Sequence, residues 1–211
     1  NSITELIGNT PVVKLNNMVK EGYADVYVKL ESFNPSSSVK DRAAFNMIED
    51  AEKQGLIKEG ATIIEPTSGN TGIGIAMVAA SRGYKSIIIM PDTATKERIS
   101  LLKMYGAEVI LTPGEELMPG CIRKAEELLN EIPNSFMPNQ FENMSNPDVH
   151  KKTTAMEILK DFGKDLDVFV ATAGTGGTIS GTGAVLKQEI PNIKIYVVES
   201  ENSPVIAGGE P

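Results

Sequence analysis

Lys40 is the residue whose type and position most directly suggest chemistry. It follows the polar turn at residues 34–38 and opens a helical pattern. A lysine rooted at the positive end of a helix dipole has its ammonium form disfavoured, which frees an amine for Schiff-base formation. By itself this is weak evidence, since Lys40-Asp41-Arg42 also fits a charged first helical turn with Ser38 as its N-cap.

The segment Gly174-Thr175-Gly176-Gly177-Thr178 has the composition of a phosphate-binding turn. Its small residues let backbone N–H groups converge on an anion, and an expected helix follows it. Neither familiar phosphate motif fits, because Thr182 replaces the lysine of a Walker loop and Ile179 stands where the dinucleotide pattern needs glycine. A phosphate cradle and a tightly packed strand-to-helix turn both remain open.

A second small-residue segment, Thr67-Ser68-Gly69-Asn70-Thr71, offers hydroxyls, an amide and helix N-terminal N–H groups in a short stretch. That set suits a carboxylate, which accepts several hydrogen bonds from one side. The alternative is an ordinary helix N-cap, which favours the same residue types. Three other residues are assigned no chemistry of their own: Gln140 follows a short strand, His150 is expected on an exposed helical face, and Cys121 is expected in a helical core.

Composition limits the class of protein. The 211 residues carry a formal net charge of −8, with 41% hydrophobic and 23% charged residues. Such an acidic chain argues against a nucleic-acid or anionic-membrane partner, since both require a basic surface. One cysteine and one histidine exclude an internal disulfide and a metal site built on several such ligands, so no metal is expected. The lack of a long apolar run and of signal-peptide features predicts a cytoplasmic protein.

Apolar strands and helices alternate from about residue 60 onward. Strands are expected at 62–65, 86–90, 108–111, 135–137, 168–171 and 195–198. Helices are expected at 70–82 (with Gly83 as C-cap), 95–105, 146–162 and 176–188, and another follows the turn at 112–114 and ends near residue 130. Strands without polar alternation, each followed by a helix, predict a parallel sheet covered on both faces. Ligands bind such sheets at the carboxyl ends of the strands, where both small-residue segments lie.

The two ends of the chain depart from this pattern. Residues 10–15 and 24–30 predict strands with no long helix between them. The chain stops one strand after its last helix, which would leave an unpaired sheet edge. We therefore expect a fragment, or a polypeptide whose remainder was removed.

Together these segments resemble the β-family (fold type II) of pyridoxal-phosphate enzymes and, within it, the cysteine synthases, also called O-acetylserine sulfhydrylases. The resemblance is carried by residues 36–42, 67–71 and 174–178, and extends to 5–11, 125–127, 140–141 and 150–154. It covers nearly the whole chain, and three ordered loops at matching spacing are far more specific than any one of them. It implies an α/β fold with two open, twisted, mostly parallel sheets flanked by helices.

The resemblance also implies roles for individual residues. Lys40 would form the Schiff base with pyridoxal phosphate and remove the substrate α-proton. Asn70 would hydrogen-bond the ring hydroxyl of the cofactor, and Gly174, Thr175, Gly176, Gly177 and Thr178 would bind its phosphate. The substrate carboxylate would be held by Thr67, Ser68, Asn70, Thr71 and Gln140. The implied reaction is β-replacement, in which O-acetyl-L-serine and sulfide give L-cysteine and acetate.

The implied architecture is a smaller domain at about 41–145 and a larger one built from 1–40 plus 146–211, with the cofactor between them. Members of the family are usually homodimers, and serine acetyltransferase is a possible partner. The sequence departs from the family where Ala155-Met156-Glu157 replaces Gly-Pro-Glu, which predicts a local backbone adjustment. Nothing matches the last third of the family's chain, which completes the larger domain and carries a serine facing the pyridine nitrogen.

Two alternatives remain open at this point. One is a related enzyme with similar loops, such as cystathionine β-synthase or threonine dehydratase. The other is a catalytically silent fragment or binding module that keeps the fold without turnover.

Overall fold

The computed structural model describes residues 2–202 and 204–209. The chain forms two compact units, Asn1–Asn143 and Met144–Pro211. By its contacts the segment 1–40 falls within the first unit. The domain division expected from the resemblance, 41–145 against 1–40 plus 146–211, stays a prediction.

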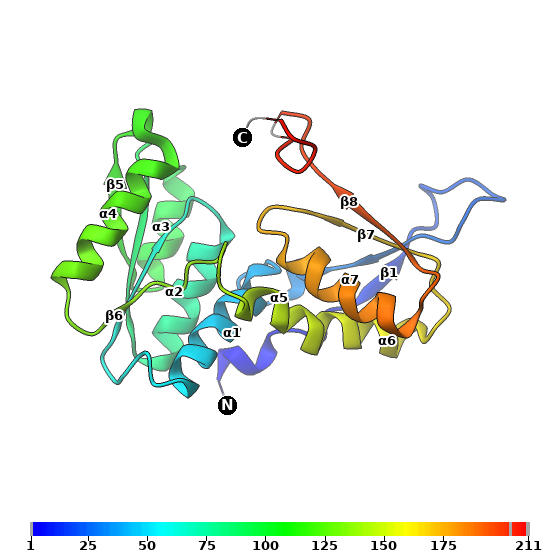
Figure 1. Ribbon diagram of the computed structural model, residues 1–211, viewed down its shortest axis with the longest axis horizontal. Coiled ribbons are helices and arrows are strands. Elements are labelled where there is room, and N and C mark those ends of the chain that lie inside the picture. Colours follow the sequence, from blue (N-terminus) through cyan, green and yellow to red (C-terminus); the bar gives the residue numbers. More distant parts are fainter. Residues whose placement is uncertain (1, 203, 210–211) are drawn as a thin grey trace. The chain divides into compact units, whose positions relative to one another are not determined.

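The first unit contains a parallel sheet with the strand order β5-β4-β3-β6 (Figure 1). The strands are β3 (Thr62–Pro66), β4 (Lys85–Pro91), β5 (Glu108–Thr112) and β6 (Ser135–Phe136). Every pairing in this sheet is parallel. Parallel neighbours require crossover connections, which are supplied by α2 (Asn70–Arg82), α3 (Lys96–Met104) and α4 (Leu117–Glu131). The expected alternation of strands and helices is confirmed in this unit.

Each face of the sheet is covered by helices, as the apolar strands predict. Ile63 and Ile88 belong to the core cluster that contains residues of α1 (Lys40–Lys53) and α2. Ile64 and Ile87 belong to a second cluster, which contains Cys121 of α4. Successive residues of a strand point to opposite faces, so an uninterrupted run of isoleucines fills both cores.

Gly83 ends α2 in the left-handed conformation, with φ of 77°, and its N–H donates to carbonyls of the preceding turn. This confirms the expected glycine C-cap, since a residue without Cβ adopts this conformation at no steric cost. The thiol of Cys121 is fully buried, 3.1 Å from the hydroxyl of Thr112. The expectation that Cys121 belongs to the core is therefore confirmed.

The first forty residues form short elements. They are η1 (Ile3–Leu6), β1 (Val12–Lys14), β2 (Tyr27–Lys29) and η2 (Glu31–Phe33). The two strands pair antiparallel and are shorter than the sequence predicts. A further 3-10 turn, η3 (Gly114–Glu116), precedes α4.

The second unit pairs β7 (Val168–Thr172) with β8 (Lys194–Val198) in parallel, joined by α7 (Gly177–Glu189). The expected helix at 146–162 is present in three consecutive parts: α5 (Ser145–Val149), a π-helical turn η4 (His150–Thr154) and α6 (Ala155–Phe162). The backbone passes through Ala155 with helical φ and ψ of −64° and −42°. Ile158, Leu186 and Ile193 form the core of this unit.

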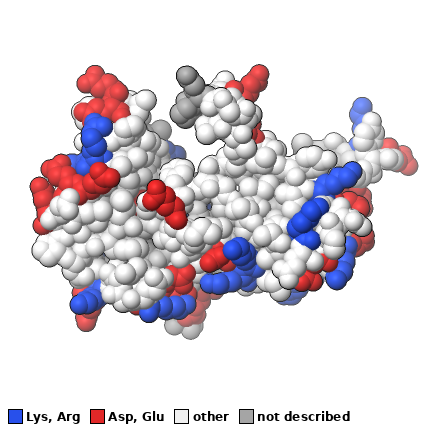
Figure 2. All heavy atoms as spheres, in the orientation of Figure 1, with Lys and Arg blue, Asp and Glu red and all other residues white. Residues whose placement is uncertain are grey.

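Acidic and basic side chains are interspersed on the face drawn in Figure 2. Within the described part of the chain, no helix has the length and apolar character needed to cross a membrane. The described residues likewise contain no group of three or more histidine, cysteine, aspartate or glutamate side chains arranged to hold a metal ion.

Candidate active site

Lys40 is the first residue of α1, and its side chain is partly buried. Burial lowers the pKa of its ammonium group below the ordinary value, because the charged form loses hydration. The helix dipole at this position would shift the pKa of Lys40 in the same direction, and that contribution stays a prediction. The backbone N–H of Lys40 donates to the hydroxyl of Ser38 over 3.1 Å, although the formal N-cap residue is Val39.

The turn before Lys40 is fixed by the next residue along the chain. Asp41 is fully buried, and its carboxylate accepts hydrogen bonds from the backbone N–H of Ser36 at 2.7 Å and from the Ser36 hydroxyl. Burial raises the pKa of Asp41, and the hydrogen bonds from Ser36 oppose that effect. Ser37 lies between these partners with a positive φ of 65°. The polar turn is therefore held in one shape immediately before the lysine.

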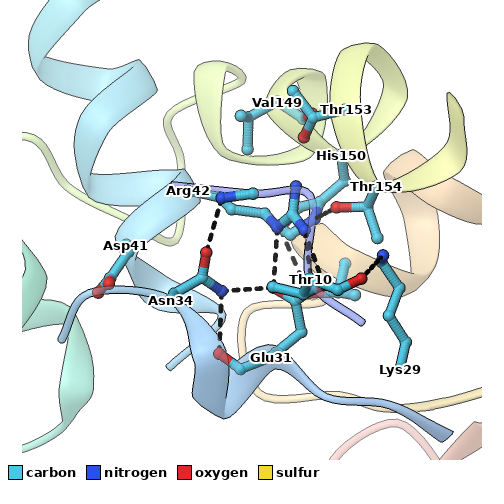
Figure 3. A network of polar contacts seen from close by, with 12 residues as sticks. Thr10, Lys29, Glu31, Asn34, Asp41, Arg42, Val149, His150, Thr153 and Thr154 are labelled. Carbon is cyan, nitrogen blue, oxygen red and sulfur yellow. Dashed lines mark hydrogen bonds and ion pairs between the residues drawn. The ribbon is translucent and has the colours of Figure 1, made fainter. Parts of the chain in front are cut away.

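An ion pair anchors the first turn of α1 to the N-terminal segment (Figure 3). The guanidinium of Arg42, 1% exposed, donates from Nε to Glu31 Oε2 and from Nη2 to Glu31 Oε1, both over 2.8 Å. Glu31 also accepts from the Thr10 hydroxyl at 2.6 Å and from Asn34 Nδ2 at 2.8 Å. Burial disfavours the Glu31 carboxylate, yet Arg42 and these polar partners outweigh it and lower its pKa. Arg42 is two residues from Lys40, so this network fixes the position of the Lys40 backbone at the start of α1.

The Thr67–Thr71 loop connects the carboxyl end of β3 to the start of α2. Thr67 is buried, and its hydroxyl accepts from the N–H of Gly69 at 3.2 Å. Asn70 is the first residue of α2 and is exposed, and Ser68 is partly exposed. Hydroxyl, amide and helix N-terminal N–H groups thus gather at one strand end, which is an arrangement that suits an anion.

Gln140 meets this loop from a distant part of the chain. It is buried, and its Oε1 accepts the hydroxyl proton of Thr71 over 2.6 Å. The backbone N–H groups of Asn139 and Gln140 donate to the two carboxylate oxygens of Glu65, over 2.9 and 3.2 Å. Lys40, the loop and Gln140 all belong to the first unit, where α1 and α2 pack directly against each other.

The Gly174–Thr178 segment lies in the second unit, at the carboxyl end of β7 and the start of α7. Gly176 has a positive φ of 78°, and Gly177 is the first helical residue. Asn146 Nδ2 donates to the hydroxyl of Thr175 over 2.9 Å, and that hydroxyl also accepts from the N–H of Gly177 at 3.3 Å. The segment is therefore a strand-to-helix turn, as expected, with its hydroxyl at residue 175 engaged by neighbours.

His150 contradicts the expectation of an exposed helical face. Its side chain is 2% exposed, with Nδ1 2.8 Å from the hydroxyl of Thr154 and Nε2 3.3 Å from the hydroxyl of Thr178. The reason is its packing against α7 of the same unit: a Cβ built on Gly181 would lie 2.9 Å from the His150 Cβ, so α7 covers this face of the π-helical turn. Sequence reasoning thus missed a residue that contacts the glycine-rich segment.

Comparison with known families and proteins decides the relationship. The model of the family "Pyridoxal-phosphate dependent enzyme" matches residues 3–210. The chain belongs to this family. The resemblance inferred from the three loops is thereby confirmed, as are the α/β fold class and the pyridoxal-phosphate cofactor.

Several relatives of this pyridoxal-phosphate-dependent chain are named. It is 63% identical over 210 residues to "Probable cysteine synthase" of Bacillus subtilis (strain 168), with 98% of this chain and 68% of that protein aligned. It is 59% identical over 211 residues to "Cysteine synthase" of Staphylococcus aureus (strain N315), covering 100% of this chain and 68% of that protein. The crystal structure of a hydrogen sulfide-producing enzyme from Fusobacterium nucleatum superposes with a TM-score of 0.95 at 52% identity, covering all of this chain and 68% of the other.

The glycine-rich segment of this pyridoxal-phosphate enzyme has room for a phosphate group. A Cβ built on Gly174 or Gly176 would meet nothing within 4 Å, so open space lies beside both glycines. A Cβ on Gly177 would instead fall 2.3 Å from Asn146 Oδ1, so the Asn146 side chain would have to move to admit any larger residue there. Backbone N–H groups at a helix N-terminus, next to open space, fit a phosphate dianion. The residues present therefore fit the cofactor of the family.

Glu65 is the second residue that the sequence analysis overlooked. It is 1% exposed near the carboxyl end of β3, and burial raises its pKa to about 7, against the effect of the hydrogen bonds from Gln140 and Asn139. The available signal was a single charge following Ile63-Ile64 in an apolar strand. A charged side chain in such a strand is buried only when it has partners, so this pattern predicts hydrogen-bond donors facing Glu65.

Proposed function

We propose that this protein is a cysteine synthase, which replaces the acetoxy group of O-acetyl-L-serine with sulfide and yields L-cysteine and acetate. The observation that carries the proposal is the Lys40 amine. It stands at the start of α1 with its pKa lowered by burial, in the same unit as the Thr67–Thr71 loop, which we propose binds the substrate carboxylate. The names of relatives at 59–63% identity support the same activity.

Lys40 is the proposed catalytic residue. When bound, pyridoxal phosphate supplies an electron-withdrawing ring that stabilises negative charge at the substrate Cα. The Nζ of Lys40 would hold the cofactor, and the same amine would take the proton from the substrate Cα. A lowered pKa serves this role, because it increases the fraction of lysine present as free amine near neutral pH.

The remaining residues bind and orient the reactants. Thr67, Ser68, Thr71 and Gln140 hold the substrate carboxylate, and Asn70 binds the cofactor ring hydroxyl with a further contact to the substrate. Gly174, Thr175, Gly176, Gly177 and Thr178 bind the cofactor phosphate. The support for these roles is the gathering of donors at two strand-to-helix turns and the open space beside Gly174 and Gly176.

Reduction with borohydride tests the role of Lys40 directly. The chain is incubated with pyridoxal phosphate, reduced, digested and analysed by mass spectrometry. We expect a pyridoxyl group on Lys40 and loss of that adduct in Lys40→Ala. An adduct confined to other lysines would contradict the proposal. Cysteine formation from O-acetyl-L-serine and sulfide is measured in parallel.

Two alternatives give different results in the same assays. A silent binding module would carry the pyridoxyl group on Lys40 but form no cysteine. A cystathionine β-synthase-like enzyme would prefer homocysteine to sulfide as the nucleophile. Neither alternative has a structural observation in its favour over the main proposal.

We further propose that the protein is a cytoplasmic homodimer and that serine acetyltransferase is a partner. These proposals rest on the family resemblance. Light scattering during size-exclusion chromatography tests the dimer, and co-elution with added serine acetyltransferase tests the partner.

A further inference from the structure

Glu65 occupies an unusual position for a carboxylate. It lies in β3 and is fully surrounded by protein, with 1% of its surface exposed. Burial of an ionised carboxylate costs free energy unless its oxygens receive hydrogen bonds. Both do: Oε2 accepts from the N–H of Asn139 at 2.9 Å, and Oε1 accepts from the N–H of Gln140 at 3.2 Å.

These two N–H groups lie just beyond the end of a strand. β6 consists of Ser135 and Phe136 alone, and it pairs with Thr62 and Ile63 of β3. The pairing of the two strands ends at Phe136, and the Glu65 side chain provides the next acceptors along β3. Asn139 has a positive φ of 50°, and its carbonyl accepts from the N–H groups of Glu142 and Asn143. Glu65 thus fixes the start of a turn that carries Gln140.

The same turn delivers Gln140 to the proposed carboxylate loop. The Thr71 hydroxyl donates to Gln140 Oε1 over 2.6 Å, and both residues are buried. Glu65 precedes Thr67 by two residues on the same strand end. The Glu65 side chain therefore joins the two parts of the chain that are proposed to form the substrate-carboxylate site. We call this site, made of Thr67, Ser68, Thr71 and Gln140, the clamp.

We propose that Glu65 is a positioning residue for the amino-acid carboxylate: it holds the backbone of Gln140 so that the Gln140 side chain meets Thr71. This inference rests on the proposed function of the clamp. Glu65 itself does not touch the substrate in this account. It acts through Gln140.

A neutral residue of the same size would not accept both backbone hydrogen bonds. A glutamine side chain has one acceptor oxygen, whereas two N–H donors converge on Glu65. Its NH₂ group would face one of those donors, and a buried N–H would be left unpaired. The hydrogen bonds to two successive backbone N–H groups thus explain why a carboxylate is retained in an apolar strand despite its desolvation cost.

The test compares four forms of the full chain loaded with pyridoxal phosphate: wild type, Glu65→Gln, Gln140→Ala and the double variant. Glu108→Gln is the matched control, because it makes the same chemical change at an exposed position of the same sheet. Titration calorimetry measures the affinities for L-serine and, separately, for pyridoxal phosphate. Amide hydrogen exchange of Asn139 and Gln140, followed by NMR in the absence of cofactor, reports the contact itself.

We expect Glu65→Gln to weaken L-serine binding about tenfold and to speed exchange of the two amides, while the affinity for pyridoxal phosphate changes less than about twofold. Glu108→Gln should change none of these. In the Gln140→Ala background, Glu65→Gln should weaken L-serine binding little further, because both changes act through one side chain. Glu65→Asp keeps two acceptor oxygens on a shorter stem and should show an intermediate loss, which provides a second variant if Glu65→Gln does not fold.

Two failures are distinguishable. Faster amide exchange in Glu65→Gln or Glu65→Asp with unchanged L-serine affinity would show a purely structural role and overturn this inference alone. A wild-type chain that takes up pyridoxal phosphate on Lys40 but binds no L-serine would overturn the proposed function, and the clamp with it.

Discussion

Gly74 of α2 lies directly against the carbonyl oxygen of Lys40. A Cβ built on Gly74 would stand 3.2 Å from that oxygen and 3.1 Å from the Cβ of Ala44. Helices α1 and α2 therefore approach with no side chain of α2 between them at this point. The first turn of α1, which carries Lys40, is placed by backbone contact with the helix that begins at Asn70.

Gly74→Val should separate the two helices and displace Lys40. Overpacking of this kind costs about 1–3 kcal/mol of folding free energy. Ala80→Val is the control, since it adds the same branched side chain at an exposed position of α2. Urea unfolding compares the stabilities, and the yield of pyridoxyl-Lys40 after borohydride reduction compares the placement of the lysine. Equal yields in both variants would contradict the role of this contact.

Gly177→Ala should weaken binding of pyridoxal phosphate about tenfold or more. Its Cβ would fall 2.3 Å from Asn146 Oδ1, so Asn146 must move and its hydrogen bond to Thr175 is lost. Gly183→Ala is the control within the same helix, because its Cβ would meet only the side chain of Ile195, at 3.1 Å. Calorimetric titration with pyridoxal phosphate measures the affinity of each variant for the cofactor. A similar loss in the two variants would point to a general weakening of α7.

Glu31→Ala should destabilise the first unit by about 3 kcal/mol, because it leaves the buried Arg42 guanidinium without its carboxylate. Asp25→Ala removes an exposed ion pair with Lys14 and should leave the urea midpoint unchanged. The lowered pKa of Glu31 gives a pH signature. The ionised Glu31 carboxylate stabilises the fold above its unfolded-state pKa, and this stabilisation is lost as pH falls through the folded-state pKa. The difference in unfolding free energy between wild type and Glu31→Ala should therefore become smaller in acid.

Glu65 should produce the opposite pH dependence. Its folded-state pKa is raised from 4.5 to about 7, so between these values the folded chain binds a proton that the unfolded chain releases. The stability of wild type relative to Glu65→Gln should therefore fall as pH rises through this window, by on the order of 3 kcal/mol. Urea unfolding at about pH 5 and about pH 7.5 measures the difference. A stability of wild type relative to Glu65→Gln that rises with pH would contradict the raised pKa.

The sequence was sufficient for the parts of the fold that depend on local pattern. The isoleucine runs of β3 and β4, the helix between them and its Gly83 C-cap all follow from periodicity and glycine chemistry. The loops at 67–71 and 174–178 were indicated by small polar residues at a strand end, although an ordinary N-cap or a packed turn favours similar residues. The family match then confirmed the resemblance that these loops suggested.

What the sequence did not provide depends on contacts between distant residues. The burial of His150 follows from its packing against α7, which local periodicity does not predict, and the flanking charges favoured exposure. The partners of Glu65 are backbone groups more than seventy residues away. Lys40-Asp41-Arg42 fits a charged first helical turn by sequence, yet Glu31 and Thr10 bind the Arg42 guanidinium from a separate segment.

The enclosed thiol of Cys121 gives the protein a built-in reporter. It is the only cysteine in the sequence, it is 0% exposed, and it lies in the core between the sheet and α4. A thiol-specific dye can reach it only when α4 detaches or the first unit opens. The rate of labelling therefore measures how often that part of the molecule opens by local unfolding, without any engineered probe.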